Sequence, residues 1–344
     1  MKKIIVVLSA LGLLLAACAP KQPATLTVMT HDSFSVSEEV VQAFETANNV
    51  KLVFLPSGDA GAMLNKAILT KEAPLADVLF GVDNTFLSRA IDADIFTAYE
   101  SPALKDVPAE FQLDPSHRAT PIDFGDVCIN YDKKYFADNS LAVPQSLAAL
   151  TQPEYANLLV VQNPATSSTG LAFLLASIAQ FGEDGYLDYW RALKANGVVV
   201  VDGWETAYYT NFSASSGKGP QPMAVSYGTS PAAEVIFADP PVTEAPTASI
   251  VSTGSCFRQI EFAAILKGTQ NQVLAEKFID FMLGVQFQQD MPLQMFVYPV
   301  NPNVTLPAAF TQYAQAPAEP ATLDPALIAA NRDAWIQAWV EVMK

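Results

Sequence analysis

The sequence predicts an α/β protein built from two lobes, and three observations predict it. The chain has 344 residues, which exceeds what one ordinary hydrophobic core accommodates. Hydrophobic residues make up 51% of the chain and aromatic residues 10%, as in a folded protein with a large core. Apolar strand-like segments alternate with helix-like segments, and this alternation favours a parallel sheet covered by helices.

The N-terminus indicates an export signal that ends in a lipidation site. Lys2 and Lys3 supply a charged start, residues 4–15 are apolar, and two alanines precede Cys18. The apolar run is too short to span a bilayer comfortably. We expect residues 1–17 to be removed and Cys18 to carry acyl chains, which would anchor the protein at the outer side of the cytoplasmic membrane or in the periplasm. The alternative is a plain signal peptide with an incidental cysteine.

The charge of the chain excludes one class of partner. Lys and Arg number 19 against 35 Asp and Glu, a formal net charge of −16. Loss of the signal peptide removes two lysines and no acid, and so makes the charge −18. No basic surface is available to meet phosphates, so nucleic acid is not expected as a partner. An acidic exterior also draws small cations toward clefts.

The first third of the chain contains three units in which a strand precedes a helix. The expected strands are 26–30, 51–55 and 77–82, and the expected helices are 36–47, 60–69 and 86–91. Polar loops follow the three strands at 30–33, 57–61 and 83–84. Since ligands sit beyond the carboxyl ends of the strands in open α/β sheets, we expect these loops to share one rim.

The remaining elements continue the pattern and end in helices. The expected strands are 122–131, 160–164, 198–201 and 257–266, and the expected helices are 171–180, 187–194, 272–283, 285–291 and 325–343. Segments rich in Gly, Pro and Ser at 213–222 and 240–246 are expected to be surface loops. No internal repeat is present.

Two kinds of side chain gather at the strand ends. Four consecutive hydroxyls, Thr166 to Thr169, occupy a strand-to-helix turn, where they would bind an anion or polar oxygen or would simply cap the helix. Trp204, Tyr227 and Phe296 each lie on a loop at or near the end of a strand-like segment. Aromatic faces near acidic residues suit a flat or cationic ligand.

Enzyme signatures are poor. Ser215 and Lys218 fit a Ser-x-x-Lys pattern, but they lie in a Gly/Pro loop and have no Lys-Thr-Gly partner, which favours a chance match. Metalloprotease, Walker, nucleophile-elbow and dinucleotide motifs are missing, and His31 and His117 are the only histidines. We expect no catalysis and no cofactor. After Cys18, the cysteines Cys128 and Cys256 form either one disulfide or two buried thiols.

Several stretches together resemble the thiamine-binding lipoproteins and periplasmic proteins, the substrate-binding subunits of thiamine ABC importers. The motifs Tyr-x-Thr-Ser-Pro-Ala and Tyr-Pro-Val…Asn-Val-Thr-Leu-Pro are the most specific of them. In chain order, the matching stretches are residues 30–34, 77–84, 121–125, 131–133, 166–171, 203–208, 226–232, 298–307 and 332–335.

The resemblance implies a type 2 periplasmic-binding-protein fold, with two α/β lobes joined by a two-strand hinge and the ligand cleft between them. Residues 18–25 would be a tether, 26–122 plus 260–344 the first lobe, and 123–259 the second lobe. The two crossing strands would run side by side, which would bring Cys128 close to Cys256 and favour a hinge disulfide.

The resemblance also implies a ligand set. The family's contacts correspond to Asp59, Ala60, Ser167, Ser168, Trp204, Tyr227, Gly228, Thr229 and Ser230, and less directly to His31, Asp32, Asp83, Thr166 and Phe296. Asp59 would meet the positive, amine-bearing end of thiamine, the aromatic rings would stack on it, and the two serines would hold its hydroxyethyl oxygen or a phosphate. The family usually has other residues at His31, Phe296 and Ala60.

The expected function is therefore the capture of thiamine, or its mono- or diphosphate, by a monomer that delivers it to a membrane permease. Ferric-ion capture by a related transport protein, through Tyr208, Tyr209, Tyr227 and His31, is the alternative within the same superfamily. An exported Ser-x-x-Lys hydrolase is the alternative from another class.

Overall fold

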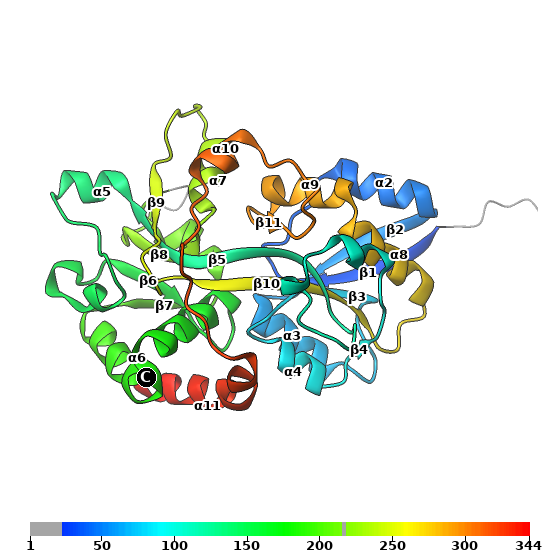
Figure 1. The fold of residues 1–344 in the computed structure, drawn as a ribbon, viewed down its shortest axis with the longest axis horizontal. Helices are drawn as coiled ribbons and strands as arrows, with labels where there is room; N and C mark the ends of the chain where they lie inside the picture. Colours follow the sequence, from blue (N-terminus) through cyan, green and yellow to red (C-terminus); the bar gives the residue numbers. More distant parts are fainter. Residues whose placement is uncertain (1–22, 215–217) are drawn as a thin grey trace, which may run out of the picture.

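Two α/β lobes joined by two long strands make up the computed structural model, which describes residues 23–214 and 218–344 (Figure 1). This two-lobed α/β architecture confirms the predicted fold class. The predicted signal peptide, Cys18 and most of the tether lie outside the described residues, and so does Ser215 of the Ser-x-x-Lys pattern. Within the described part of the chain, no helix has both the length and the apolar character needed to span a membrane.

One continuous mixed sheet runs through both lobes in the order β2-β1-β3-β10-β5-β8-β6-β7, with β4, β9 and β11 attached at its sides. The strands are β1 (Ala24–Thr30), β2 (Val50–Pro56), β3 (Val78–Asp83), β4 (Phe96–Thr97), β5 (Thr120–Asp132), β6 (Leu159–Gln162), β7 (Val199–Val201), β8 (Met223–Tyr227), β9 (Thr247–Ile250), β10 (Phe257–Leu266) and β11 (Tyr298–Pro299). Each lobe contains a group of parallel strands, as predicted: β1 pairs with β2 and β3, and β6 pairs with β7 and β8. The crossing strands β5 and β10 pair with their neighbours in antiparallel orientation.

Helices cover the sheet in both lobes (Figure 1). They are α2 (Glu38–Asn48), α3 (Ala60–Leu69), α4 (Leu87–Asp92), α5 (Lys133–Asp138), α6 (Ser168–Ala195), α7 (Ser230–Ile236), α8 (Gln272–Leu283), α9 (Val285–Gln294), α10 (Ala308–Tyr313) and α11 (Pro325–Met343), with a π-helical turn η6 (Thr206–Asn211). The two helices expected at 171–180 and 187–194 form the single element α6. A break at Gly182, whose φ of 74° suits glycine, separates its two halves.

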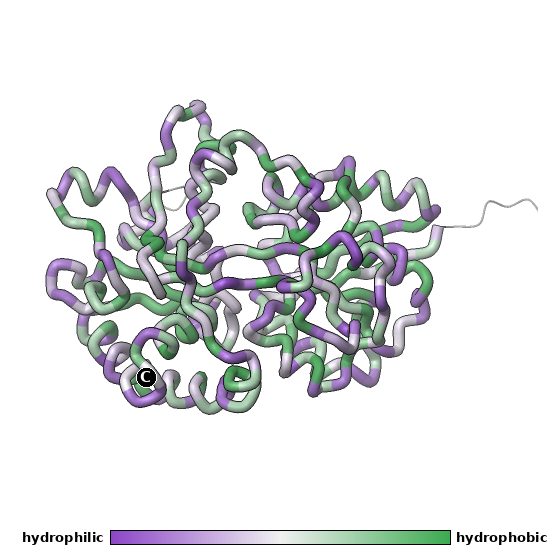
Figure 2. Tube along the Cα trace, viewed as in Figure 1, coloured by the Kyte–Doolittle hydropathy of each residue, from purple (hydrophilic) through white to green (hydrophobic). Residues whose placement is uncertain are grey.

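The two crossing strands β5 and β10 pair with each other in antiparallel register from Val127↔Phe257 to Thr120↔Ala263. The side-by-side arrangement implied by the family resemblance is therefore present. Figure 2 shows hydrophilic stretches on these strands in the middle of the molecule, whereas the strands inside the lobes are mostly hydrophobic. The crossing strands thus carry polar side chains into the centre of the protein.

The C-terminal segment corrects the predicted lobe boundaries. Helix α10 packs against α7 and helix α11 packs against α6, so both pack mainly on the second lobe, and Arg332 of α11 also donates a hydrogen bond to Ser88 of the first lobe at 2.9 Å. Trp335 and Trp339 supply the physical reason, because both are buried there and Trp339 meets Trp190 edge to face at 5.4 Å between ring centroids. The first lobe therefore keeps only the part of 260–344 that precedes α10.

A disulfide joins Cys128 to Cys256 beside the Val127↔Phe257 pair, at the second-lobe end of the crossing strands. Both cysteines are buried. Of the two alternatives, the structure contains the disulfide and not two separate thiols.

Replacing both cysteines by serine should lower the free energy of unfolding by about 5 kcal/mol, because the bond closes a loop with a sequence separation of 128 residues. Urea denaturation of the oxidised protein and of the Cys128→Ser/Cys256→Ser variant measures the difference. A reductant should destabilise the parent protein and leave the double variant unchanged. Equal denaturation midpoints for parent and variant would contradict a stabilising bond.

Candidate functional site

Residues from both lobes line one cavity of about 990 Å³. The loop after β1 and the segment between α9 and β11 contribute from the first lobe. The second lobe contributes the region around η6, the end of β8, and α7 with the loop that follows it. Glu261 reaches the cavity from the crossing strand β10. A ligand in this cavity would therefore touch both lobes and the strands that connect them.

Acidic side chains dominate the charge of the cavity. Lys134 is the one lysine or arginine among the described lining residues, and its ammonium lies 2.6 Å from a carboxylate oxygen of Asp138. The six acids of the lining are Asp32, Asp132, Glu205, Glu234, Asp239 and Glu261. Carboxylates that converge on one hollow create a negative potential there. The cavity favours a cation.

Aromatic rings form one wall of the cavity around Trp204. The indole of Trp204 stacks on Tyr208, with centroids 5.1 Å apart and planes at 12°, and Tyr209 meets it edge-on at 5.3 Å. Trp204 Nε1 donates a hydrogen bond to Ser226 Oγ at 2.9 Å. The orientation of the indole is therefore fixed by contacts on its face and on its polar edge, which suits it to stack on a flat cationic ring.

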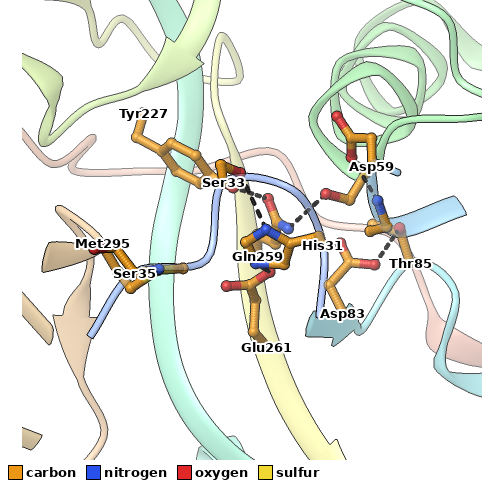
Figure 3. A network of polar contacts seen from close by, with 12 residues as sticks. His31, Ser33, Ser35, Asp59, Asp83, Thr85, Tyr227, Gln259, Glu261 and Met295 are labelled. Carbon is orange, nitrogen blue, oxygen red and sulfur yellow. Dashed lines mark hydrogen bonds and ion pairs between the residues drawn. The ribbon is translucent and has the colours of Figure 1, made fainter. Parts of the chain in front are cut away.

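Tyr227 lies over the crossing strand β5 because the residue beneath it is glycine. A Cβ on Gly125 would come within 2.9 Å of the Tyr227 ring. The Tyr227 hydroxyl donates to Gln259 Oε1 at 3.1 Å, and Gln259 Nε2 donates to Ser168 Oγ at 3.0 Å (Figure 3). One chain of hydrogen bonds thus links the phenol on β8, the crossing strand β10 and the start of α6.

The polar loops after the first strands share one rim, as predicted. The amide of Asp32 donates to the carbonyl of Gly58, and the amide of Gly58 donates to the Asp32 carboxylate at 2.8 Å. His31 lies over Gly81 of β3, where a Cβ would come within 2.3 Å of the imidazole. Burial lowers the pKa of His31 to about 4, so the ring is neutral near pH 7.

The Asp59 region forms a contact between the lobes. Asp59 caps α3, and its Oδ2 accepts a hydrogen bond from the backbone N–H of Trp204 at 2.9 Å. Burial raises the pKa of Asp59, and the hydrogen bonds it accepts lower it. The amides of Gly61 and Ala62 donate to the carbonyl of Thr166 at 2.9 and 3.2 Å. The start of α3 is therefore joined directly to the turn that precedes α6.

The predicted ligand set divides into two groups in the structure. Six of its members line the cavity, namely His31, Asp32, Trp204, Tyr227, Ser230 and Phe296. The others lie outside that lining, namely Asp59, Ala60, Asp83, Thr166, Ser167, Ser168, Gly228 and Thr229. Ser167 and Ser168 bond to Thr169 and Gln259, and the amide of Gly228 bonds to the carbonyl of Asp126. The turn with four hydroxyls contacts the first lobe through the backbone carbonyl of Thr166 and the crossing strand β10 through Ser168.

Three acids of the lining, Glu261, Glu205 and Glu234, were not predicted as site residues from the sequence. Glu261 had a detectable signal, because it is the only charged residue in the otherwise apolar run from 260 to 266. An acid inside a buried strand is rare unless it serves a specific purpose. The other two acids lie in helical segments, where the sequence alone does not tell which face meets the cavity.

Three carboxyls form a row beneath the cavity. Glu261 on β10 is the cross-strand partner of Asp83 on β3 and of Asp123 on β5. Asp83 and Asp123 are fully buried and Glu261 is 5% exposed. Burial raises the pKa values of Asp83 and Asp123 to about 7 and raises that of Glu261 well above its ordinary value. We call Asp83, Glu261 and Asp123 the carboxyl row.

The ferric-ion alternative requires a cluster of metal ligands and ionised tyrosines. No group of three or more His, Cys, Asp or Glu residues with metal-binding geometry occurs within 23–214 and 218–344. Burial raises the pKa values of Tyr208 and Tyr227 well above 10, which disfavours the phenolate form that a ferric ion requires. Tyr208 also donates its hydroxyl to Glu234.

Comparison with known proteins gives a consistent family. Residues 73–324 match the family described as bacterial extracellular solute-binding protein. The thiamine-binding periplasmic protein of Escherichia coli (strain K12) is 33% identical over 336 residues, which cover 96% of this chain and 97% of that protein. The thiamine-binding periplasmic protein of Brucella suis biovar 1 is 30% identical, with 92% and 91% covered.

Solved structures agree with these relatives. A periplasmic thiamin binding protein superposes with a TM-score of 0.82 at 30% identity, covering 95% of this chain and 98% of that one. A ferric binding protein from Campylobacter jejuni superposes with a TM-score of 0.72 at 17% identity, covering 92% and 99%. The second likeness shows a shared fold alone.

The carboxyl row should make the stability of the ligand-free protein depend on pH. Asp83 and Asp123 keep their protons up to about pH 7 in the folded protein but ionise near 3.8 when unfolded. The folded protein binds more protons in that window, so the free energy of unfolding contributed by these groups falls as the pH rises through it. His31 has the opposite effect. Its contribution to the free energy of unfolding rises with pH, and it does so between about pH 4 and 6.5.

Asp123→Asn should therefore raise the free energy of unfolding at pH 8 by about 2 kcal/mol and flatten its decline between about pH 4 and 7. Urea titrations at several pH values measure both effects. Asp106→Asn, which changes an exposed carboxylate, is the matched control and should leave the pH profile unchanged. A variant that is less stable than the parent at pH 8 would show that repulsion among the three carboxyls does not destabilise the folded protein.

Proposed function

The chain belongs to the bacterial extracellular solute-binding proteins and, among them, to the thiamine-binding periplasmic proteins, and we propose that its cavity captures thiamine for import. The protein is a solute-binding component that acts outside the cytoplasm, not an enzyme. Proteins of this kind bind a small molecule and work with an ABC transporter permease in the membrane. We further propose that it acts as a monomer and that Cys18 carries its lipid anchor.

One observation carries the proposal, which is an aromatic wall that faces a cavity with six acids and a single paired lysine. Thiamine has a thiazolium cation, an aminopyrimidine and a hydroxyethyl arm. The cation matches the charge of the lining, and its flat rings match the faces of Trp204 and Tyr227. Ring stacking and charge therefore act on the same molecule in the same cavity.

The contacts between the lobes support capture by closure around the ligand. Trp204 is tied to Asp59 across the lobes, while Phe237 of the second lobe meets Phe296 of the first edge to face at 5.2 Å. Phe237 and Phe296 line the cavity. We propose that bending of β5 and β10 separates these contacts to admit thiamine and restores them once it is bound.

The lining also supports thiamine over its phosphates as the cargo. A diphosphate would bring negative charge into a hollow that already holds six acids. Ser168 Oγ accepts a hydrogen bond from Gln259, and Ser167 Oγ bonds to Thr169, so neither serine needs a phosphate as a partner. Phosphate recognition at the start of α6 therefore has little support.

Trp204→Ala should weaken thiamine binding about tenfold or more, because it removes the ring that stacks on the ligand. Isothermal titration calorimetry measures the dissociation constant, and thermal unfolding checks that the fold persists. Trp204→Phe should restore part of the affinity, since phenylalanine keeps a ring face but is a weaker cation–π partner than an indole. Unchanged affinity in the alanine variant would rule out stacking on Trp204.

An uncharged deazathiamine analogue tests the role of the ligand's charge. It keeps the shape of thiamine and lacks the thiazolium charge, so it should bind at least tenfold more weakly, and thiamine diphosphate should also bind more weakly than thiamine. Competition against bound thiamine gives the three dissociation constants in one buffer. Equal constants for thiamine and the neutral analogue would contradict recognition by charge.

A further inference from the structure

The carboxyl row is an unusual arrangement for the middle of a protein. Asp83, Glu261 and Asp123 occupy one line across three neighbouring strands, β3, β10 and β5. Residues paired in this way project from the same face of a sheet, with Cβ atoms about 5 Å apart, and like charges directly opposite each other are destabilising. Three ionised carboxylates at this spacing would repel strongly in a site that water barely reaches.

Among the described residues, the side chains that act on Glu261 do not supply a compensating positive charge. The groups that face Glu261 are Asp83, Asp123 and, further off, Asp59, with the phenol of Tyr227 and the imidazole of His31. His31 Nε2 lies 3.6 Å from Glu261 Oε1, but this imidazole is neutral near pH 7.

Arg258 is the only cation on β10, and it is already paired. It projects from the opposite face of the strand, where it donates two hydrogen bonds to Asp126, at 2.7 and 2.9 Å. The carboxyl row therefore has no arginine or lysine partner on its own face among the described groups that act on it.

Several polar atoms of this cluster also lack hydrogen-bond partners among the described residues. Asp83 Oδ1 accepts from Thr85 Oγ1 and from the amide of Phe86, whereas Asp83 Oδ2 accepts nothing. Neither oxygen of Asp123 accepts a hydrogen bond from a protein N–H or O–H group, and its polar neighbour is the carboxyl of Glu261. His31 Nε2 has no hydrogen-bond partner either. Two adjacent carboxyls form a hydrogen bond only when one of them is protonated.

Glu261 connects this buried row to the cavity. It lines the cavity together with His31 and Tyr227, and Figure 3 shows the carboxyl of Glu261 beside the imidazole of His31. Asp83 and Asp123 lie outside the lining. A cation bound in the cavity would therefore meet the row through Glu261 and would be the positive charge that the row lacks.

We propose that the carboxyl row is a proton-exchanging counter-ion for the bound cation, holding protons when the cavity is empty and releasing one when thiamine lies against Glu261. This inference rests on the proposed function. The released proton leaves a carboxyl of the row and passes to solvent, and the ligand's charge replaces it, so the net charge of the buried cluster is unchanged. No covalent bond of the ligand is altered.

The direction of the pH effect follows from linkage. Burial and neighbouring carboxylates raise the pKa of Glu261 and Asp123 in the empty protein, and a cation beside Glu261 lowers it. Between the pKa values of the empty and the loaded states, binding releases a proton, so the dissociation constant falls by up to tenfold for each unit of rising pH. Thiamine is then held more weakly in acid.

Calorimetric titration of thiamine into the full chain tests the inference, with buffers of different ionisation enthalpy at each pH from 6 to 8.5. The slope of the observed enthalpy against the buffer enthalpy gives the number of protons released. We expect up to one proton and a dissociation constant that falls as the pH rises. The neutral deazathiamine analogue should release none.

Two isosteric variants and one control sharpen the result. Glu261→Gln should weaken binding at least tenfold at pH 8 and abolish the proton release. Asp123→Asn should reduce the proton release and flatten the dependence of the dissociation constant on pH. Both changes remove buried like charge, so neither is expected to unfold the protein. Asp106→Asn, exposed in the first lobe, should match the parent in affinity and in proton count.

Infrared difference spectra of the parent protein give a readout that needs no variant. Adding thiamine at pH 7 should remove a protonated-carboxyl band and add a carboxylate band. Tight thiamine binding with no proton exchange and no such spectral change would overturn the counter-ion role and leave the proposed function intact. Equal proton release with the neutral analogue would also overturn it, because closure of the lobes would then be the cause. A parent protein that binds no thiamine at any pH would overturn the proposed function itself.

Discussion

The antiparallel pairing of β5 with β10 is the constraint on which the rest of the structure depends. These two strands connect the lobes, lie at the centre of the single sheet and carry the disulfide at their second-lobe end. They also carry Asp123, Glu261 and Gln259 on the face beneath the cavity. Any motion that opens or closes the cavity must therefore act on the strands that hold its buried charge.

The buried carboxyls destabilise the folded protein when they ionise, but they favour binding of a cationic ligand. Taking several carboxyls out of water is unfavourable unless they are paired or protonated, and the residues around this row supply no strong cation. Carboxyls that have no cationic partner in the empty site contribute more to the binding free energy of a cationic ligand than carboxyls that a protein cation already neutralises. The same carboxyls thus explain the expected pH dependence of stability and the expected selectivity for a positively charged molecule.

Two close approaches to glycine shape the floor of the cavity. Tyr227 reaches over β5 because Gly125 has no Cβ, and His31 packs on β3 because Gly81 has none. Gly81 also has a φ of 105°, a conformation that side chains rarely adopt. These glycines let an aromatic ring and an imidazole from different lobes lie directly on the sheet, next to Glu261.

The sequence by itself determined the longer strands and helices and their alternation, the two-lobed α/β class and the acidic, aromatic character of the site, because these follow from local periodicity, length and composition. Short elements such as β4, β9, β11, α5, α7 and α10 were not predicted, since so few residues leave little periodic pattern. The family resemblance added the pairing of the crossing strands. Only the tertiary structure decided that α10 and α11 pack on the second lobe, that Thr166 and Asp59 join the lobes outside the cavity, and that Glu261 lies between Asp83 and Asp123. Each depends on contacts between residues far apart in the chain, and neither local pattern nor composition encodes which distant surfaces pack together.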